Sequence, residues 1–142
     1  MTSITRRSAL ALGMLAPTLA LPQPASAADM YGPDDGKEIL PGIRQIDLGK
    51  FPVDFGGYKT SVVTDYTAKP GAEFPDDVMK NDMVCVILSG EYTVKQSGPG
   101  AADHEFVVKA GGVFSCAKDS HESDKNTSNV QAVMRVVDLL PA

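Results

Sequence analysis

The apolar residues after position 28 fall into short runs that turn-forming residues separate. The runs are rich in β-branched and aromatic residues, and Gly, Pro, Asn and Asp bound them, as is typical of strands. They predict strands at residues 43–48, 58–67, 83–88, 91–96, 104–109, 113–116, 121–124 and 130–140. The segment 29–41 is rich in Gly, Pro and Asp and has no period, so it predicts a surface arm.

Short strands at this spacing, without a helical period after the N-terminal segment, favour an all-β sandwich or barrel. An immunoglobulin-like sandwich is disfavoured because its Cys…Trp…Cys pattern needs a Trp, and the chain has none. Every residue of the run 83–88 is apolar, so both faces of this strand are expected to be covered. Because side chains alternate along a strand, Met83, Cys85 and Ile87 share one of these faces.

The first 27 residues have the pattern of a targeting segment. Arg6-Arg7 precedes an apolar run, and Ala25-Ser-Ala27 supplies the small residues that a signal peptidase requires. The apolar run is too short, and too interrupted by Gly and Pro, to span a bilayer as a stable helix. Residues 1–27 are therefore predicted to form a cleaved signal helix, and the twin arginines suggest export by the twin-arginine (Tat) route. The mature protein is expected in the periplasm or outside the cell.

The length of the chain indicates the number of domains, and its charge indicates which classes of binding partner are unsuitable. The chain has 142 residues and a formal net charge of −5, which becomes −7 once the two arginines leave with the signal. Scattered Lys and Arg on an acidic domain are poorly suited to nucleic acid or anionic lipid, so neither nucleic acid nor, after signal cleavage, a membrane is expected as a partner. The length is that of one domain, expected to divide into an N-terminal arm with the first strand at 28–57 and a barrel at 58–142.

Two glycine-bounded stretches carry the most specific pattern in the chain. In the first, Gly71 and Gly90 enclose Asp77, Met79 and Met83 at fixed spacings. This stretch resembles the first motif of the cupin family, which has H-x-H and E at those three inner positions.

The second stretch begins at Gly111 and ends at Asn126, with Ala117, Asp119 and Glu122 between them. It resembles the second cupin motif, which has P-x-G and H at those inner positions. Together the two stretches cover about half of the mature chain. The resemblance implies a cupin-like double-stranded β-helix, which is a jelly-roll barrel.

The resemblance also implies which side chains point into the barrel: Asp77, Met79, Met83 and Glu122. In cupins the residues at these four positions hold an iron, manganese, zinc or nickel ion. Such ions prefer imidazole, carboxylate and water, and two thioethers with two carboxylates match them poorly. We therefore expect no metal and no other cofactor here, with the methionines filling the barrel. The register that turns Met83 inward also turns Cys85 and Ile87 inward.

The leading hypothesis is an exported cupin-like barrel that binds a small molecule or serves as a structural module. Its expected pocket consists of Asp77, Met79, Met83, Cys85, Cys116 and Glu122. The first alternative is a cupin-type enzyme in which Glu122 acts as acid or base on a small substrate such as a sugar or keto acid. Burial raises the pKa of a carboxyl group and suits it to that role. His121 would assist if the preceding turn slipped by one residue and exchanged the faces of the strand.

The second alternative is a protein that handles Cu(I). Its soft donors would be Met79, Met83, Cys85 and Cys116, because thioether and thiolate ligands suit this ion. A disulfide between the cysteines would remove half of these donors. In an exported protein such a pair suggests a disulfide, which would close a loop of about 31 residues and stabilise by roughly 3–4 kcal/mol. Two buried thiols that pack as small apolar side chains explain the sequence equally well.

The C-terminal run 130–140 is long and apolar, with Arg135 and Asp138 as its only charged residues. At an exposed sheet edge such a strand would pair with another chain unless something covered it. We therefore expect a homodimer that forms through this strand.

Overall fold

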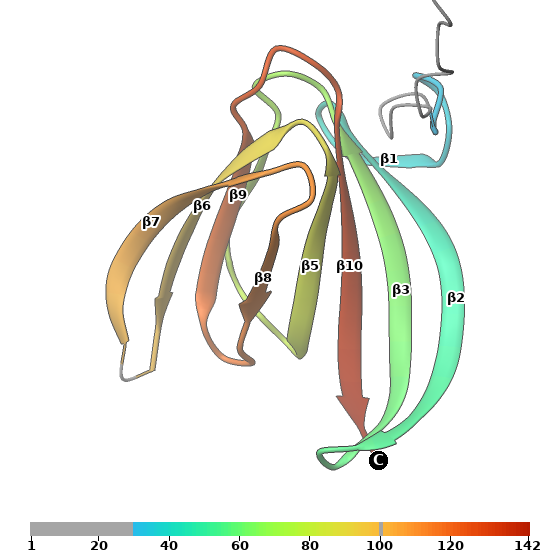
Figure 1. Cartoon of the computed structure of the whole chain (residues 1–142), viewed down its shortest axis with the longest axis vertical. Coiled ribbons are helices and arrows are strands. Elements are labelled where there is room, and N and C mark those ends of the chain that lie inside the picture. The colour runs from blue at the N-terminus through green and yellow to red at the C-terminus, as the bar shows by residue number, and fades with distance from the viewer. Residues whose placement is uncertain (1–29, 100) are drawn as a thin grey trace, which may run out of the picture.

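The computed structural model describes residues 30–99 and 101–142, which form two facing antiparallel sheets (Figure 1). The strands are β1 Lys37–Leu40, β2 Ile43–Phe55, β3 Tyr58–Ala68, β4 Glu73–Val78, β5 Asp82–Ser89, β6 Glu91–Gly98, β7 Ala101–Lys109, β8 Val113–Cys116, β9 His121–Asn126 and β10 Ala132–Pro141. The six-stranded large sheet has the order β1-β2-β3-β10-β5-β8, and the four-stranded small sheet has the order β4-β9-β6-β7. The described residues contain no helix, so the all-β prediction is confirmed.

The predicted signal helix (1–27) lies outside the described residues. Across the described chain, no helix has the length and apolar character that crossing a membrane requires. The segment expected to form an arm and a first strand (28–57) contributes β1 and β2, and both belong to the large sheet.

Two strands, β1 and β4, were not predicted from the sequence. Each is the first or last strand of its sheet, and all four residues of β1 are at least partly exposed. The sequence of β4 contains Pro75 and three acidic residues, a composition that is typical of turns. At a sheet edge, however, a proline costs no ladder hydrogen bond and acidic side chains remain in water. The turn-like composition of residues 73–78 therefore marks an edge strand.

Strand β2 is longer than predicted because it continues, with shifts in register, where the sequence suggested that it would end. The expected strand ended at residue 48, where Gly49 and Pro52 interrupt the pattern. The structure continues to Phe55, and the register of β2 against β3 shifts between Asp47 and Gly49 and again between Pro52 and Phe55. A bulge absorbs an extra residue without ending a strand. Gly49 and Pro52 therefore lie at register shifts of one continuous strand and do not end it.

Strand β10 is not at a sheet edge. It pairs with β3 on one side and with β5 on the other, and its buried residues include Val133, Met134 and Val136. Its apolar sequence therefore reflects a central strand with a neighbour on each side. The prediction that residues 130–140 form an exposed edge strand is wrong, and β10 has no free edge through which a homodimer could form.

The glycine and asparagine that bound the motifs have structural roles. Gly90 has a φ of 75°, and a Cβ on it would lie 2.7 Å from the Cβ of Ala132. Only a residue without a side chain fits this turn. Asn126 is fully buried, and its Nδ2 donates to the carbonyl oxygens of Ala68 and Val130, each at 2.9 Å. It ties the end of β9 to the end of β3 and to the turn before β10.

The core lies between the sheets. Its fully buried apolar residues are Ile43, Ala68, Ile87, Tyr92, Val94 and Ala132. On β5, Cys85 and Ile87 face this core as expected, with exposed fractions of 1% and 0%. Val84, Val86 and Leu88 face the other side of the sheet and are only half-buried. The predicted alternation of β5 is therefore confirmed.

Candidate functional site

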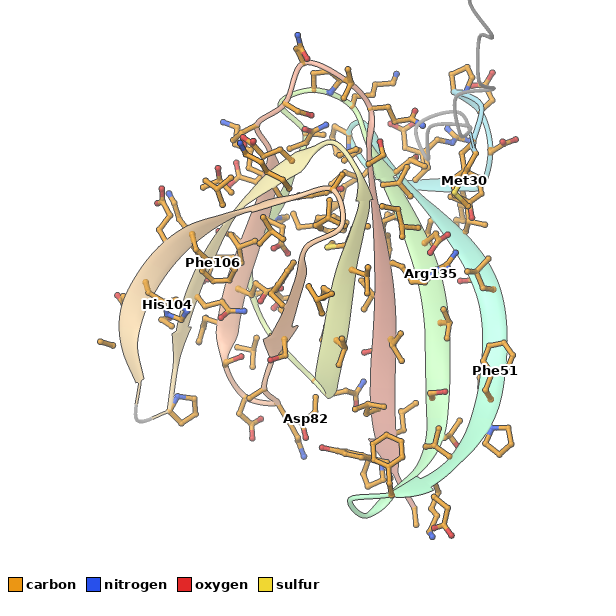
Figure 2. All side chains as sticks on the ribbon, viewed as in Figure 1. Met30, Phe51, Asp82, His104, Phe106 and Arg135 are labelled. Atoms are coloured by element: carbon orange, nitrogen blue, oxygen red, sulfur yellow. The ribbon has the colours of Figure 1, made fainter. Side chains whose placement is uncertain are left out.

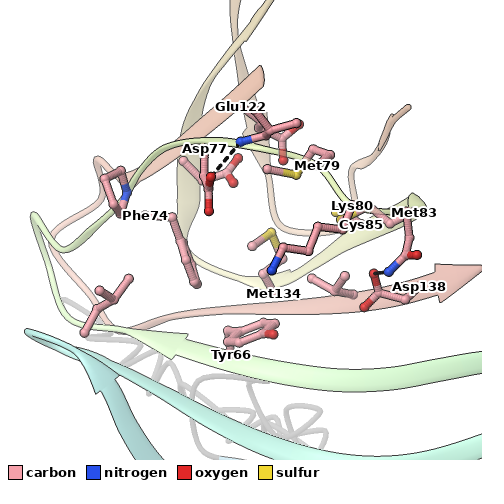
Figure 3. Close-up of a pocket in the computed structure, with 16 residues that line it drawn as sticks. Tyr66, Phe74, Asp77, Met79, Lys80, Met83, Cys85, Glu122, Met134 and Asp138 are labelled. Atoms are coloured by element: carbon pink, nitrogen blue, oxygen red, sulfur yellow. Dashed lines mark hydrogen bonds between the residues drawn. The ribbon is translucent and has the colours of Figure 1, made fainter. Parts of the chain in front are cut away.

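A cavity of about 410 Å³ opens between the two sheets (Figure 3). Its wall comes from β1, β3, β4, β5, β9 and β10 and from the connection between β4 and β5, so strands of both sheets build it. Tyr66 and Phe74 form part of the apolar wall, with their rings edge to face and centroids 5.3 Å apart. Figure 3 shows Glu122 across the cavity from Tyr66. An apolar wall with a few convergent polar groups is the usual build of a small-molecule site.

The structure brings together most of the residues that were expected to form the pocket. Asp77, Met79, Met83, Cys85 and Glu122 all line the cavity. Cys116 does not line it, but its sulfur lies directly behind the wall, close to that of Cys85.

The alternation of side chains along β9 sets which of its acidic and basic groups face the cavity. Glu122 and Asp124 point between the sheets and are 3% and 6% exposed. Because side chains alternate along a strand, His121 points away from the cavity. Its Nδ1 lies 3.2 Å from Oδ2 of Asp76 on the outer surface. The one-residue slip does not occur, and the structure does not bring Glu122 and His121 into one site.

Asp124 is the site residue that the sequence analysis missed. Burial, followed by the charge of Glu122 and a hydrogen bond with it, raises the pKa of Asp124 to about 8. Glu122 also accepts a hydrogen bond of 2.5 Å from Nε2 of Gln96 on β6. The spacing in the sequence could have indicated this residue. Asp124 follows Glu122 by two residues, so on a strand the two side chains share a face.

Two buried polar atoms of this region have no hydrogen-bond partner within the described residues. They are Oδ1 of Asp124 and the hydroxyl of Tyr92. Burial and the nearby Asp124 raise the pKa of Tyr92, so its phenol remains protonated. An unpaired buried polar atom costs free energy, and one at a cavity wall is an available contact for a bound molecule.

The cysteines are free thiols and both are buried. In the register of β5 against β8, Cys85 lies opposite Phe114 and Cys116 lies opposite Met83. The two cysteines are therefore diagonal neighbours on the inner face. The hydrogen bond with Cys116 and burial raise the pKa of Cys85, and the nearby carboxyl groups add to the effect.

The four cupin ligand positions do not form a metal site for iron or manganese. Asp77 is exposed, and its Oδ1 accepts a hydrogen bond of 2.8 Å from the backbone nitrogen of Val78. Met79 and Met83 offer only thioethers, which suit soft ions. Glu122 alone is a buried carboxylate. One buried oxygen ligand is too few for these ions, so the four positions do not fit such a metal.

Comparison with known proteins identifies the fold. No family model and no curated protein matches the sequence. The structure resembles KdgF from Halomonas sp., with a TM-score of 0.59 and 14% identity over 78% of this chain and 89% of that one. It resembles an RmlC-like cupin from Shewanella frigidimarina, with a TM-score of 0.57 and 18% identity over 75% and 82% of the two chains.

A third similar structure is the cupin domain of Cnp3 from Schizosaccharomyces pombe. Its TM-score is 0.55 and its identity 20%, over 69% of this chain and 64% of that one. The chain therefore spans less than two thirds of that protein. At these identities the likeness concerns the fold alone. The cupin fold that the two sequence motifs implied is confirmed.

Proposed function

We propose that this chain is an exported cupin-like barrel that binds a small molecule between its two sheets without the metal site usual in cupins. The observation that carries the proposal is the half-open cavity of about 410 Å³, which falls within the range of small-molecule sites. Apolar and aromatic side chains form most of its wall. Such a wall binds apolar groups by removing their surface from water.

The polar groups of the cavity favour one class of ligand. Asp77, Glu122, Asp124 and Asp138 line it, against the single cation of Lys80. An anionic ligand would meet like charges there, whereas a hydrogen-bond donor finds the unpartnered Oδ1 of Asp124. The ligand we propose therefore has an apolar or aromatic body and an amine or another donor group.

Aromatic amines and matched aromatic acids test this proposal. Benzylamine is expected to raise the melting temperature of the mature protein, and benzoate of the same size is not. Phe74→Ala removes one aromatic wall and is expected to weaken amine binding about tenfold or more, since burying such a side chain contributes roughly 1.5–3 kcal/mol. The matched control is Phe51→Ala, because Phe51 is 49% exposed on β2 (Figure 2) and does not line the cavity. Equal shifts by amine and acid, or equal losses in both variants, would refute the proposal.

Export is part of the proposal and rests on residues 1–27. Expression in a host with a functional twin-arginine pathway is expected to yield periplasmic protein that begins at Ala28. Changing Arg6 and Arg7 together to Lys is expected to keep the precursor in the cytoplasm. Mass spectrometry of the fractionated cells measures both outcomes. Intact precursor from the unaltered sequence would contradict the cleavage site.

We also propose a homodimer, now through the outer face of the large sheet. Val113 on β8 is 60% exposed there, and Val84, Val86 and Leu88 on the neighbouring β5 are only half-buried. Apolar side chains gathered on one exposed face are typical of an interface. Sedimentation at micromolar concentration measures the state, and a monomer would exclude the dimer.

A further inference from the structure

A compact group of three side chains lies at the cavity wall, where Cys85 and Glu122 line the cavity and Cys116 lies behind them. The sulfur atoms of Cys85 and Cys116 and a carboxylate oxygen of Glu122 all lie within 4.8 Å of one another. All three residues are buried, with exposed fractions of 1%, 5% and 3%. They come from β5, β8 and β9, so both sheets contribute to the group.

These separations match donors that share one ion. Zinc binds thiolate sulfur at about 2.3 Å and carboxylate oxygen at about 2.0–2.2 Å, so two ligand atoms of a tetrahedral site are about 3.5–3.8 Å apart. The observed upper limit of 4.8 Å leaves at most about 1 Å for rotamer changes to close when an ion binds.

A neighbouring side chain already orients the carboxylate. Nε2 of Gln96 donates to Oε2 of Glu122 at 2.5 Å and to the carbonyl oxygen of Ser115 at 3.0 Å. Ser115 immediately precedes Cys116 on β8, so Gln96 links β8 and β9, two of the three strands that carry donors. Residues that hold a ligating group in place in this way are a regular part of metal sites.

A second observation, independent of the donor distances, points to a bound group. Asp124 is 94% buried, lines the same cavity, and leaves Oδ1 without a partner in the described part of the chain. Glu122 shares the inner face of β9 with it, two residues earlier in the chain. The unpaired oxygen can accept a hydrogen bond from a water or ligand that completes the coordination of an ion beside it.

We propose that Cys85, Cys116 and Glu122 form a binding site for one thiophilic d¹⁰ metal ion, with an open coordination position that faces the cavity. Two thiolates select such ions, and the carboxylate favours Zn²⁺ over Cu(I), which would use the two sulfur atoms alone. The site does not depend on the proposed small-molecule ligand. It uses only one of the four cupin ligand positions, at Glu122.

The affinity of the site for a metal ion is expected to depend on pH, because binding releases protons. Each thiol must release its proton to the solvent before its sulfur binds the ion. Two released protons lower the apparent affinity by about 100-fold for each unit of pH below neutrality. The cavity provides the route of entry, since Cys85 and Glu122 both line it.

Cobalt titration of the reduced, metal-free mature protein tests the proposal. One equivalent of Co²⁺ is expected to give thiolate-to-metal charge-transfer absorption and the visible bands of tetrahedral cobalt, and one equivalent of Zn²⁺ is expected to remove both. Cys85→Ser and Cys116→Ser are each expected to lower Zn²⁺ affinity by more than about 100-fold, which exceeds the usual effect of losing an outer-shell partner. Gln96→Ala is expected to lower it about 10- to 100-fold while the charge-transfer absorption remains, as for a positioning residue.

Glu122→Gln tests whether the site prefers Zn²⁺ or Cu(I), and Asp76→Asn is its matched control. Asp76 is an exposed carboxylate of β4 that contacts His121 on the outer face, so its loss is expected to leave the Zn²⁺ affinity unchanged. Glu122→Gln is expected to weaken Zn²⁺ binding and to leave the charge-transfer absorption in place. A strong preference for Cu(I) that Glu122→Gln does not alter would overturn the three-donor site.

Two results with the unaltered protein overturn the proposal and do not depend on any variant folding. The first is a titration without charge-transfer absorption and without stoichiometric Zn²⁺. The second is a disulfide in the exported protein, seen as a mass lower by two hydrogen atoms and as the absence of free thiols, because that bond consumes both sulfur donors.

Discussion

The metal-free protein is expected to lose stability as the pH rises from about 4 to about 8, and Asp124→Asn is expected to abolish most of that loss. Burial beside Glu122 raises the pKa of Asp124 from 3.8 to about 8. Between these values the folded state holds a proton that the unfolded chain has released. Stability is therefore greatest below this interval and falls as the pH passes through it, on the order of a few kcal/mol in total.

Urea unfolding at pH 5, 7 and 9 in the presence of a chelator measures this effect. Asn has nearly the shape of a protonated Asp and no charge to bury, so the two proteins are expected to match at pH 5. At pH 9 the variant is expected to be the more stable. The exposed Asp77, opposite Glu122 on β4, serves as the control position, where Asn should leave the pH profile unchanged. Parallel profiles for the original protein and Asp124→Asn would show that Asp124 is not the group responsible.

The carboxyl pair also shows why part of the site escaped sequence analysis. Residues 119–125 are mostly polar, which is typical of a solvated segment. In the structure β9 lies between β4 and β6, and its inner face packs against the core. Glu122 could be anticipated because the cupin resemblance assigns that position an inward side chain. Asp124 has no such marker, and its burial depends on strands that are distant in sequence.

Strands with apolar sequences were predictable for a physical reason. A strand that packs one face into the core, such as β5, must be apolar at every second residue, and that requirement is visible in a run of six residues. An edge strand has no such requirement, so β1 and β4 resemble loops in composition. The apolar run 130–140 likewise predicted a strand, now β10, but its expected place at a sheet edge was wrong.

The approach of Cys85 to Cys116 could not be deduced from sequence. It depends on the register of β5 against β8, in which Cys85 faces Phe114 and not Cys116. A shift of one residue would place one sulfur on the outer face of the sheet. The sequence limited the pair to a disulfide or two buried thiols, and the structure has two free thiols whose sulfur atoms lie within 4.8 Å.

The second large effect concerns a charge pair on the outer face of the large sheet, away from the cavity. Asp65 on β3 is fully buried, and its carboxylate accepts two hydrogen bonds from Arg135 on β10, from Nε at 2.8 Å and from Nη2 at 2.9 Å. The hydroxyl of Tyr31 donates a third at 2.6 Å. Figure 2 shows Arg135 over the large sheet, near the segment that carries Met30. Asp65 thus holds the N-terminal segment and two central strands together.

Asp65→Ala is expected to lower the free energy of unfolding by roughly 3 kcal/mol. Removing one partner of a buried ion pair costs about 3–5 kcal/mol, and the lower end applies because the Arg135 side chain remains 35% exposed. Tyr31→Phe removes only one hydrogen bond and is expected to cost about 1 kcal/mol. Urea or thermal unfolding of the mature protein, with the metal content fixed by a chelator, measures both.

A double variant separates the ion pair from simple packing. Val at both Asp65 and Arg135 replaces two charges by an apolar cross-strand pair, and the two positions are directly opposite in the register. Such replacements are often neutral or stabilising, because no charge remains without a partner. Asp65→Val combined with Arg135→Val is therefore expected to be more stable than Asp65→Val alone. If the two substitutions instead add their separate costs, the pair is not coupled, and the stability of this face must come from the packing of β3 against β10.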